Sequence, residues 1–218
     1  MSYSIAIDGP AGAGKSTIAK LIAKKKGYIY IDTGAMYRAM ALYFIEAGIG
    51  AEEQDKISAA VQDANVTITY ENGEQNVWLN GRNVNGLIRT EKVSMMTSLT
   101  SANKAVREKL VELQRALAQK ENVVMDGRDI GTCVLPNANV KVYLTASSHV
   151  RALRRYHELE QKGESCDLAE IEKDIIQRDK QDMSREISPL KQAEDAVPID
   201  SSDMTIEEVA DAIIALCK

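Results

Sequence analysis

The most restrictive feature of this 218-residue sequence is a glycine-rich stretch near its N-terminus. Residues 9–16 read GPAGAGKS and fit the pattern G-x-x-x-x-G-K-[ST] without a mismatch. Glycines allow positive φ angles, so consecutive backbone N–H groups can converge on one anion. Lys15 offers a mobile cation for β- and γ-phosphates, and the Ser16 hydroxyl can bind Mg²⁺. The stretch therefore predicts a loop that binds the phosphates of a nucleoside triphosphate.

The neighbouring sequence supplies the context that such a loop requires. A short apolar run, Tyr3 to Asp8, precedes it and predicts a buried strand. Ile18, Leu21 and Ile22 then recur at helical spacing, and three lysines followed by Gly27 end the helix. A chance glycine-rich turn would lack this context. The residues expected at the triphosphate are Gly9, Pro10, Ala11, Gly12, Ala13, Gly14, Lys15, Ser16 and Thr17.

Strands and helices alternate along most of the remaining chain. We expect strands at 28–31, 123–125, 140–144 and 197–199, and helices at 36–46, 90–101, 103–119, 148–161 and 168–185. Thr205 to Glu208 is a capping box that predicts a last helix, and residues 162–165 predict a mobile loop. This order is typical of an α/β protein with a parallel sheet.

Residues 65–86 break the alternation. Two short β-rich runs flank Asn72-Gly73, and Asn80-Gly81 follows them. Asn-Gly is the strongest short hairpin signal, so this stretch predicts a small antiparallel unit inserted into the α/β core.

Composition excludes several classes of function. The formal net charge of −5 argues against a protein that binds duplex nucleic acid through a basic surface. No apolar run approaches the 18 residues of a membrane span, and Asp8 interrupts the N-terminal apolar run, so we expect neither a membrane segment nor a signal peptide. Three widely spaced cysteines indicate reduced thiols in the cytoplasm, and two histidines argue against a His-rich metal site.

Two strand ends carry polar residues that suggest a second anion site. Asp32 follows the second expected strand, and Arg38 lies in the next helix. Asp126, Arg128 and Asp129 follow the expected strand at 123–125. Carboxyl ends of parallel strands meet at one edge, where ligands bind, so these groups should lie near the glycine-rich loop. Asp126 could hold Mg²⁺ through water. The alternatives are a plain helix cap with a solvent-exposed arginine and an ordinary turn.

A third group of arginines occurs in helical segments. Arg178 and Arg185 lie seven residues apart, with Asp182 between them on the same helical face. They could grip a phosphate with planar guanidinium groups, or form an exposed ladder of salt bridges. The same two interpretations apply to Arg151, Arg154 and Arg155.

These groups suffice for one type of chemistry. If the acceptor is a nucleotide phosphate, the nucleophile is already anionic and needs no strong general base. Transfer then depends on positioning, charge neutralisation and exclusion of water. Two alternatives stay open at this stage: a kinase for a different small acceptor, which needs a base, and a nucleotide-gated switch that acts through partners.

With these residues in place, the chain resembles the bacterial cytidylate kinases over essentially its whole length. The matching stretches are IAIDGPAGAGKST (5–17), IDTGAMYR (31–38), IRT (88–90), AVREKL (105–110), VMDGRDIGT (124–132) and RDKQDMSREISPL (178–190). The resemblance implies a P-loop NTPase fold, a three-layer α/β/α arrangement with a central parallel sheet, an inserted NMP-binding subdomain and a short lid. It implies transfer of a phosphoryl group from ATP to CMP or dCMP with Mg²⁺.

The resemblance also implies roles for individual positions. Cytosine recognition would fall to Ser98, Arg107 and Asp129, and the sugar to Arg178 and Asp182. Arg38, Arg128 and Arg185, together with Lys15, would hold the acceptor phosphate, and Arg154 would act as a lid arginine on the donor phosphates. Mg²⁺ would lie near Ser16 and, through water, Asp126.

The expected organisation is a single domain over 1–218. Its core would comprise about 1–36, 104–150 and 180–218, the NMP-binding region about 37–103 and the lid about 151–170. We expect a monomer in the cytoplasm whose partners are ATP, CMP and dCMP, with no nucleic acid and no membrane.

Overall fold

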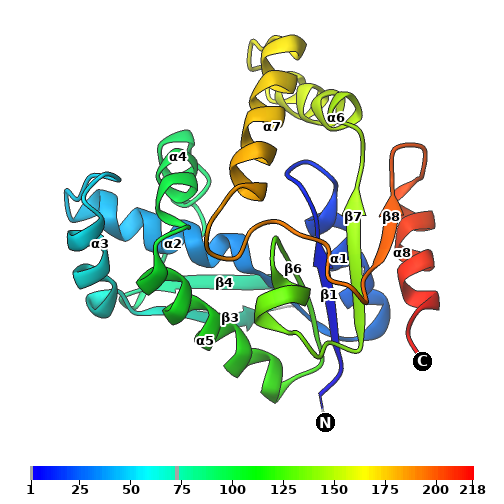
Figure 1. Cartoon of the computed structure of the whole chain (residues 1–218), viewed down its shortest axis with the longest axis horizontal. Helices are drawn as coiled ribbons and strands as arrows, with labels where there is room; N and C mark the ends of the chain where they lie inside the picture. The colour runs from blue at the N-terminus through cyan, green and yellow to red at the C-terminus, as the bar shows by residue number, and fades with distance from the viewer. Residues whose placement is uncertain (1, 72–73) are drawn as a thin grey trace. The chain divides into compact units, whose positions relative to one another are not determined.

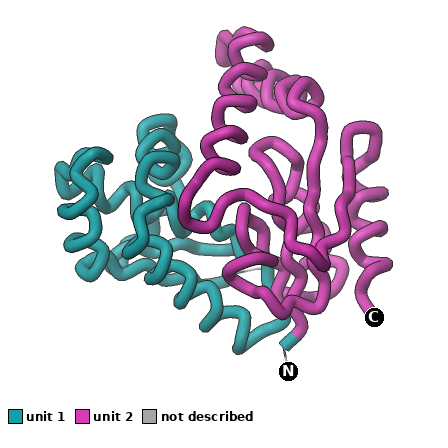
Figure 2. Tube along the Cα trace, in the orientation of Figure 1, with its two compact units in different colours: residues 1–2, 29–122 teal, residues 3–28, 123–218 magenta. Residues whose placement is uncertain are grey.

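A computed structural model describes residues 2–71 and 74–218 of the chain. The chain divides into two compact units (Figure 2). Unit 1 comprises residues 1–2 and 29–122, and unit 2 comprises residues 3–28 and 123–218. Each unit is therefore built from segments that are distant in the sequence, because the chain leaves unit 2 after residue 28 and returns to it at residue 123.

Unit 2 contains a parallel sheet flanked by helices. Its strands lie in the order β6, β1, β7, β8, and every pair is parallel. In chain order its elements are β1 (Ser4–Asp8), α1 (Lys15–Lys26), β6 (Val123–Gly127), η2 (Ile130–Val134), β7 (Val140–Thr145), α6 (Ser148–Gln161), α7 (Leu168–Met183), β8 (Val197–Asp200) and α8 (Ile206–Ala215). The expected α/β fold with a parallel sheet is confirmed.

The core of unit 2 follows from its apolar runs. Ile5, Ala6 and Ile7 of β1 are fully buried, as are Val123 to Met125 of β6. Continuous burial of this kind is typical of strands covered on both faces. Helix α1 packs on β6 and against α8. It ends at Gly27, whose φ of 67° is the left-handed conformation that favours glycine.

Helices α6 and α7 form a pair that follows β7. They lie side by side beyond the carboxyl ends of β1 and β7 (Figure 1). Ser147 caps α6 and Asp167 caps α7, each by accepting a hydrogen bond from a backbone N–H of the first turn. Helix α7 ends at Met183, two residues earlier than the sequence predicted.

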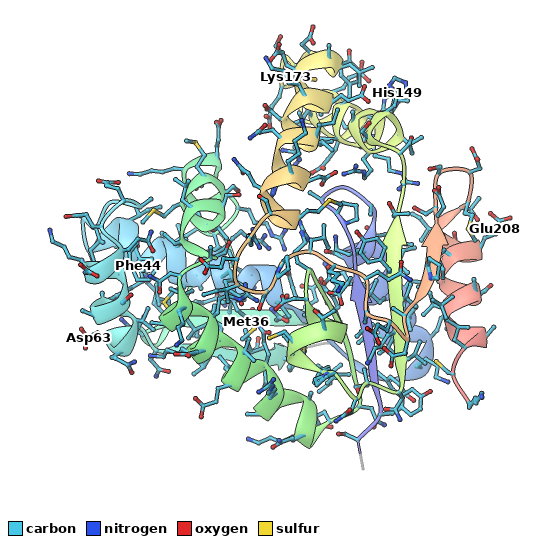
Figure 3. All side chains as sticks on the ribbon, in the orientation of Figure 1. Met36, Phe44, Asp63, His149, Lys173 and Glu208 are labelled. Carbon is cyan, nitrogen blue, oxygen red and sulfur yellow. The ribbon has the colours of Figure 1, made fainter. Side chains whose placement is uncertain are left out.

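Unit 1 combines helices with a small antiparallel sheet. Its elements are β2 (Ile29–Asp32), α2 (Thr33–Glu46), α3 (Gln54–Ala60), η1 (Val61–Asp63), β3 (Val66–Glu71), β4 (Glu74–Leu79), β5 (Arg82–Asn83), α4 (Glu91–Thr100) and α5 (Lys104–Lys120). Helix α2 supplies much of the core, and its Met36 and Phe44 are fully buried (Figure 3). Helix α2 packs against α4 and α5.

The predicted antiparallel insert is confirmed. Strand β3 pairs with β4 from Val66↔Leu79 to Glu71↔Glu74, and β4 pairs with β5. The Asn72-Gly73 turn itself lies outside the described residues. Asn80 and Gly81, the second predicted turn, have φ angles of 50° and 78°, which is the conformation that their residue types favour.

Three elements, α3, η1 and η2, were not predicted from the sequence. Helix α3 is short, and only Ile57 among its described residues is buried, so its apolar periodicity is weak. Residues 130–134 form one turn of π-helix, η2, where the sequence predicted a loop. Over residues 2–71 and 74–218, no helix has the length and apolar character needed to cross a membrane.

Candidate nucleotide-binding site

The glycine-rich loop of unit 2 connects β1 to α1. Gly12 and Gly14 have φ angles of 75° and 87°, and Gly14 is the N-cap of α1. A Cβ on Gly9 would lie 1.9 Å from the carbonyl oxygen of Leu144 in β7, so only glycine fits there. The loop therefore has the backbone conformation that the motif predicted, with a helix N-terminus behind it.

Lys15, at the start of α1, is buried beside this loop. Its Nζ donates a hydrogen bond to the carbonyl oxygen of Pro10 at 2.6 Å. Burial and, after it, the positive charge of Arg128 lower the pKa of Lys15 to about 7. The carboxylates of Asp126, Asp8 and Asp182 act in the opposite direction. A phosphate that approached Lys15 would favour its charged form and raise its pKa.

Ser16 and Asp126 are the residues that could hold a metal ion. The Ser16 hydroxyl donates to Asp126 Oδ2 at 3.0 Å, which joins α1 to the end of β6. A hydroxyl and a carboxylate are hard oxygen ligands of the kind that Mg²⁺ prefers, and Mg²⁺ keeps several of its waters. The two predicted ligands are therefore together, and their chemistry fits the ion.

The last residue of β1, Asp8, has a role that the sequence interpretation missed. Its Oδ1 accepts a hydrogen bond from Ile130 N and its Oδ2 one from Gly131 N, both at 2.7 Å. Burial raises the pKa of Asp8 to about 6, although these two bonds act against the shift. Asp8 thereby fixes the loop that follows Arg128 and Asp129 to the strand that precedes the glycine-rich loop. An acidic residue at the end of a buried strand was the available signal.

Three predicted acceptor-side residues meet in unit 2 around one buried carboxylate. Asp182 of α7 is 2% exposed, and its Oδ2 accepts from Arg128 Nε at 2.8 Å. Its other oxygen accepts from Arg185 NH2. Burial opposes the charge on Asp182, yet Arg128 and Arg185 hold its pKa below the ordinary value. The alternative of an exposed salt-bridge ladder is therefore wrong for this face of α7.

The remaining predicted residues of unit 2 lie near this cluster or near the loop. Asp129 is buried and precedes η2, whereas Arg178 lies on the exposed side of α7. Arg154 of α6 donates to the backbone oxygen of Ser201 at 2.7 Å, and its NH1 lies 3.9 Å from where a Cβ on Gly14 would be. Arg155 pairs with Glu158 at the surface.

A cavity of about 560 Å³ adjoins the glycine-rich loop. Residues of the loop and α1, of α6 and of the segment from Ser201 to Val209 line it, among them Lys15, Thr17, Arg154, Ser201 and Thr205. Its volume is in the range of small-molecule sites. Its position allows a triphosphate in the loop to continue into a pocket with both polar and apolar walls.

Unit 1 contains its own cluster of predicted residues. Asp32 caps α2 by accepting from Ala35 N at 2.9 Å, and its Oδ2 also accepts from Arg38 NH2 and Arg89 NH2, both at 3.2 Å. Sequence reasoning included Arg89 only within the IRT stretch. The Asp32 side chain is 12% exposed and that of Arg38 21%, whereas the Arg89 side chain is 65% exposed, so one largely buried carboxylate holds one enclosed and one exposed arginine.

Arg107 of α5 is buried in the same unit. Its NH1 donates to the carbonyl oxygen of Ser101 at 3.1 Å, and its guanidinium lies 5.5 Å from the ring centre of Tyr37. Tyr37 was not predicted to contribute, and its position one residue before Arg38 was the available signal. Ser98, on α4, is half-buried.

Comparisons with known proteins identify the family of the chain. A family model described as cytidylate kinase matches residues 5–218. A cytidylate kinase of Caldicellulosiruptor saccharolyticus is 51% identical over 213 residues, which cover 98% of this chain and 94% of the relative. A cytidylate kinase of Bacillus subtilis is 46% identical over 211 residues, 97% of this chain and 94% of the relative.

A solved structure supports the fold alone. A gluconokinase from Sinorhizobium meliloti superposes with a TM-score of 0.50 at 15% identity, covering 98% of this chain and 91% of the other. At that identity the match indicates a shared α/β architecture and says nothing about the acceptor.

Proposed function

The chain belongs to the cytidylate kinase family, and we propose on this premise that it transfers the γ-phosphoryl group of ATP to CMP or dCMP. The products are ADP and CDP or dCDP. The observation that supports this most directly is the charge cluster beside the glycine-rich loop, in which Lys15 is close enough to Arg128 for their charges to interact. Such a cluster suits the juxtaposed phosphates of a donor and an acceptor.

On the donor side, ATP places its phosphates in the loop at 9–16 and its remainder in the adjoining cavity. Lys15 neutralises charge on the transferred phosphoryl group, and Arg154 approaches the donor phosphates from α6. Ser16 and, through water, Asp126 would hold Mg²⁺, which would neutralise charge on the phosphate oxygens.

On the acceptor side, Arg128 and Arg185 bind the phosphate of CMP, and Arg38 of unit 1 joins them. Arg178 and Asp182 bind the sugar. Ser98, Arg107 and Asp129 recognise cytosine, since a guanidinium can donate to N3 and O2 while a carboxylate accepts from the N4 amine. A different base would leave one of these buried polar groups without a hydrogen bond, and the cost of that loss discriminates against bases other than cytosine.

The chemical step requires little of the protein beyond this. The acceptor phosphate is anionic, so no side chain has to remove a proton from it. The chain binds the two nucleotides in line, offsets their negative charge and excludes water that would hydrolyse ATP. We propose that residues of about 37–103 form the NMP-binding region. Residues of about 151–170 form the lid, which excludes water from the two nucleotides.

We further propose that the enzyme acts as a monomer in the cytoplasm and that its ligands are nucleotides, not nucleic acids. None of the predicted residues or contacts requires a second subunit. The net charge of −5 supports the exclusion of nucleic acid as a partner.

A coupled assay of ADP formation tests the proposed function. With ATP and Mg²⁺, ADP should form in proportion to added CMP or dCMP, and much more slowly with UMP or AMP. Equal kcat/KM for CMP, UMP and AMP would exclude the cytosine assignment. ADP formation that does not depend on any acceptor would instead favour a nucleotide-gated switch.

Arg107→Met sharpens the base assignment. We expect kcat/KM for CMP to fall about 10- to 100-fold while KM for ATP stays within about threefold, because one charge-assisted contact contributes about 1.5–3 kcal/mol. Arg115→Met, a substitution on an exposed position of the same helix, is the matched control. An equal loss for CMP and ATP would contradict the role.

A further inference from the structure

Arg151 is a buried arginine of α6 that joins three separate segments of unit 2. Its Nε donates to the carbonyl oxygen of Ala146 at 2.9 Å, and its NH1 donates to the carbonyl oxygen of Ala11 at 3.0 Å. Its NH2 donates to Asp179 Oδ2, on α7, at 2.6 Å. The arginine thus links the end of β7, the glycine-rich loop and α7.

The loop lies directly against this side chain. A Cβ on Gly12 would come within 3.2 Å of Arg151 Cβ, so the loop backbone is in close contact with α6. The three bonds of Arg151 all go to protein oxygens, and its side chain is 6% exposed. Arg154, one turn further along α6, reaches the loop and Ser201 beside the cavity. The two arginines therefore have different surroundings.

Asp179 places the other end of this link on the helix that carries acceptor-side residues. It follows Arg178, precedes Asp182 by three residues and is 13% exposed. In the part of the chain that the structure describes, its Oδ1 is buried without a hydrogen-bond partner. Arg151 is the ion-pair partner of this largely buried carboxylate, and removing one partner of such a pair is costly.

Helix α7 has little apolar contact that could position it otherwise. Of its described residues, Ile175 and Asp182 are the buried ones. A second contact with α6 is more exposed: Glu172, whose side chain is 27% exposed, accepts from Ser148 Oγ at 2.8 Å and lies 3.2 Å from His149 Nδ1. His149 and Lys173 both point away from the body of the molecule (Figure 3). The Arg151–Asp179 ion pair is accordingly the least exposed polar contact described between α6 and α7.

We propose that Arg151 and Asp179 together are positioning residues that hold α7, with its Arg178 and Asp182 and with Arg185 just beyond its end, in register with the glycine-rich loop. The inference rests on the proposed function, since it concerns the acceptor-side residues of the same reaction. Arg151 fixes the loop through Ala11 and the helix through Asp179. Loss of the link lets α7 shift relative to Lys15, and a displacement of about 1 Å can cost about 100-fold in rate.

The test uses three variants of the full chain. Asp179→Asn keeps the shape and removes the charge, and Arg151→Lys keeps the charge and loses the fork that reaches three acceptors. Glu172→Gln is the matched control, because it alters an α6–α7 contact that does not involve the loop. Thermal unfolding establishes that each variant is folded.

Steady-state kinetics separate positioning from direct binding. We expect Asp179→Asn to reduce kcat/KM for CMP about 10- to 100-fold with KM for ATP changed less than about threefold, and Glu172→Gln to resemble the parent. The double variant Arg151→Lys/Asp179→Asn should be little worse than the worse single variant, since both break one link. Unchanged kcat/KM for CMP in Asp179→Asn, or an equal loss in Glu172→Gln, would overturn the inference.

A readout that does not need catalysis distinguishes this inference from the proposed function. Hydrogen exchange of the backbone amides of residues 168–183 should be faster in Asp179→Asn than in the parent or in Glu172→Gln. If the parent fails to phosphorylate CMP, the proposed function is wrong, and the exchange rates still decide whether Arg151 positions α7. Equal exchange in all variants would refute the positioning role.

Discussion

The two units hold their arginines in different ways. In unit 2, Arg128 and Arg185 share the buried Asp182, and Arg151 bonds to two carbonyl oxygens and Asp179. In unit 1, Arg38 and Arg89 share the buried Asp32, and Arg89 is 65% exposed whereas Arg38 is 21% exposed, as Arg128 is. Guanidinium groups that are buried and bonded are ordered before any ligand arrives, whereas an exposed one contributes little to stability and reorients easily. The contrast therefore lies at the two shared carboxylates: both guanidinium groups on Asp182 are largely buried, and one of the two on Asp32 is exposed.

The largest effect expected from this contrast is at Lys15. If Lys15 has the proposed role, Lys15→Met should lower kcat by about 1,000-fold, or about 4 kcal/mol in transition-state stabilisation, because the variant lacks the cation that offsets charge on the transferred phosphoryl group. The assay is ADP formation with CMP, and circular dichroism checks the fold. Residual activity above a tenth of the parent would mean that the order in unit 2 contributes little to catalysis.

The next largest effect is expected at Asp182, and it distinguishes this carboxylate from Asp32, which also pairs with two arginines. Asp182→Ala leaves two buried or half-buried arginines without their shared partner, and should reduce the free energy of unfolding by about 3 kcal/mol. Urea denaturation measures the loss. A loss below about 1 kcal/mol would place Asp182 in the same class as a surface carboxylate and remove the contrast between the units.

The pH dependence of the free energy of unfolding tests the burial of Asp8 at the end of β1. The pKa of folded Asp8 is about 6, above its ordinary 3.8, so the folded chain still holds a proton there when the unfolded chain has released it. The contribution of Asp8 to the free energy of unfolding is then largest below about pH 4 and falls as the pH rises through about 6.

Asp8→Asn removes this titration. Between pH 4 and pH 7, the free energy of unfolding of the parent should fall by on the order of 2 kcal/mol relative to that of the variant. Urea denaturation at several pH values measures this difference. Parallel pH profiles for the two proteins would show that Asp8 titrates as it does in the unfolded chain.

The smallest effect is expected at the unit 1 carboxylate. Asp32→Ala removes an N-cap and two partly exposed ion pairs, and should cost about 1 kcal/mol in the free energy of unfolding. The same urea titration measures it. A loss as large as that of Asp182→Ala would show that unit 1 is as rigidly organised as unit 2.

Local signals made most of the fold predictable. The glycine-rich loop, the caps at Ser147 and Thr205 and the apolar run of β1 each depend on residues close together in the sequence. The π-helical turn at 130–134 was missed because its cause lies far away: Asp8, more than 120 positions earlier, binds its first two amides. The spacing of residues in the sequence does not predict a hydrogen bond between such distant positions.

The candidate site was predictable to the same extent and for the same reason. Arg128, Asp182 and Arg185 were recognised because two of them share a helical face and the third follows a strand. The partnership of Arg151 with Asp179 could not be foreseen, since it joins residues 28 positions apart on two helices whose packing the sequence does not specify. The exposed-ladder alternative failed because charged residues alone do not reveal which face of a helix is covered.

A change of the proposed cytosine selectivity at Asp129 would affect the hydrogen bonds that Asp8 accepts from Ile130 N and Gly131 N. Asp129 immediately precedes these amides, so a substitution there that moves the backbone also pulls on the end of β1, from which the glycine-rich loop begins. Directed evolution towards a new acceptor should therefore lose ATP affinity in its first rounds. Compensating changes would be found along the first strand and around Lys141, which borders Gly131, and not only in the base pocket.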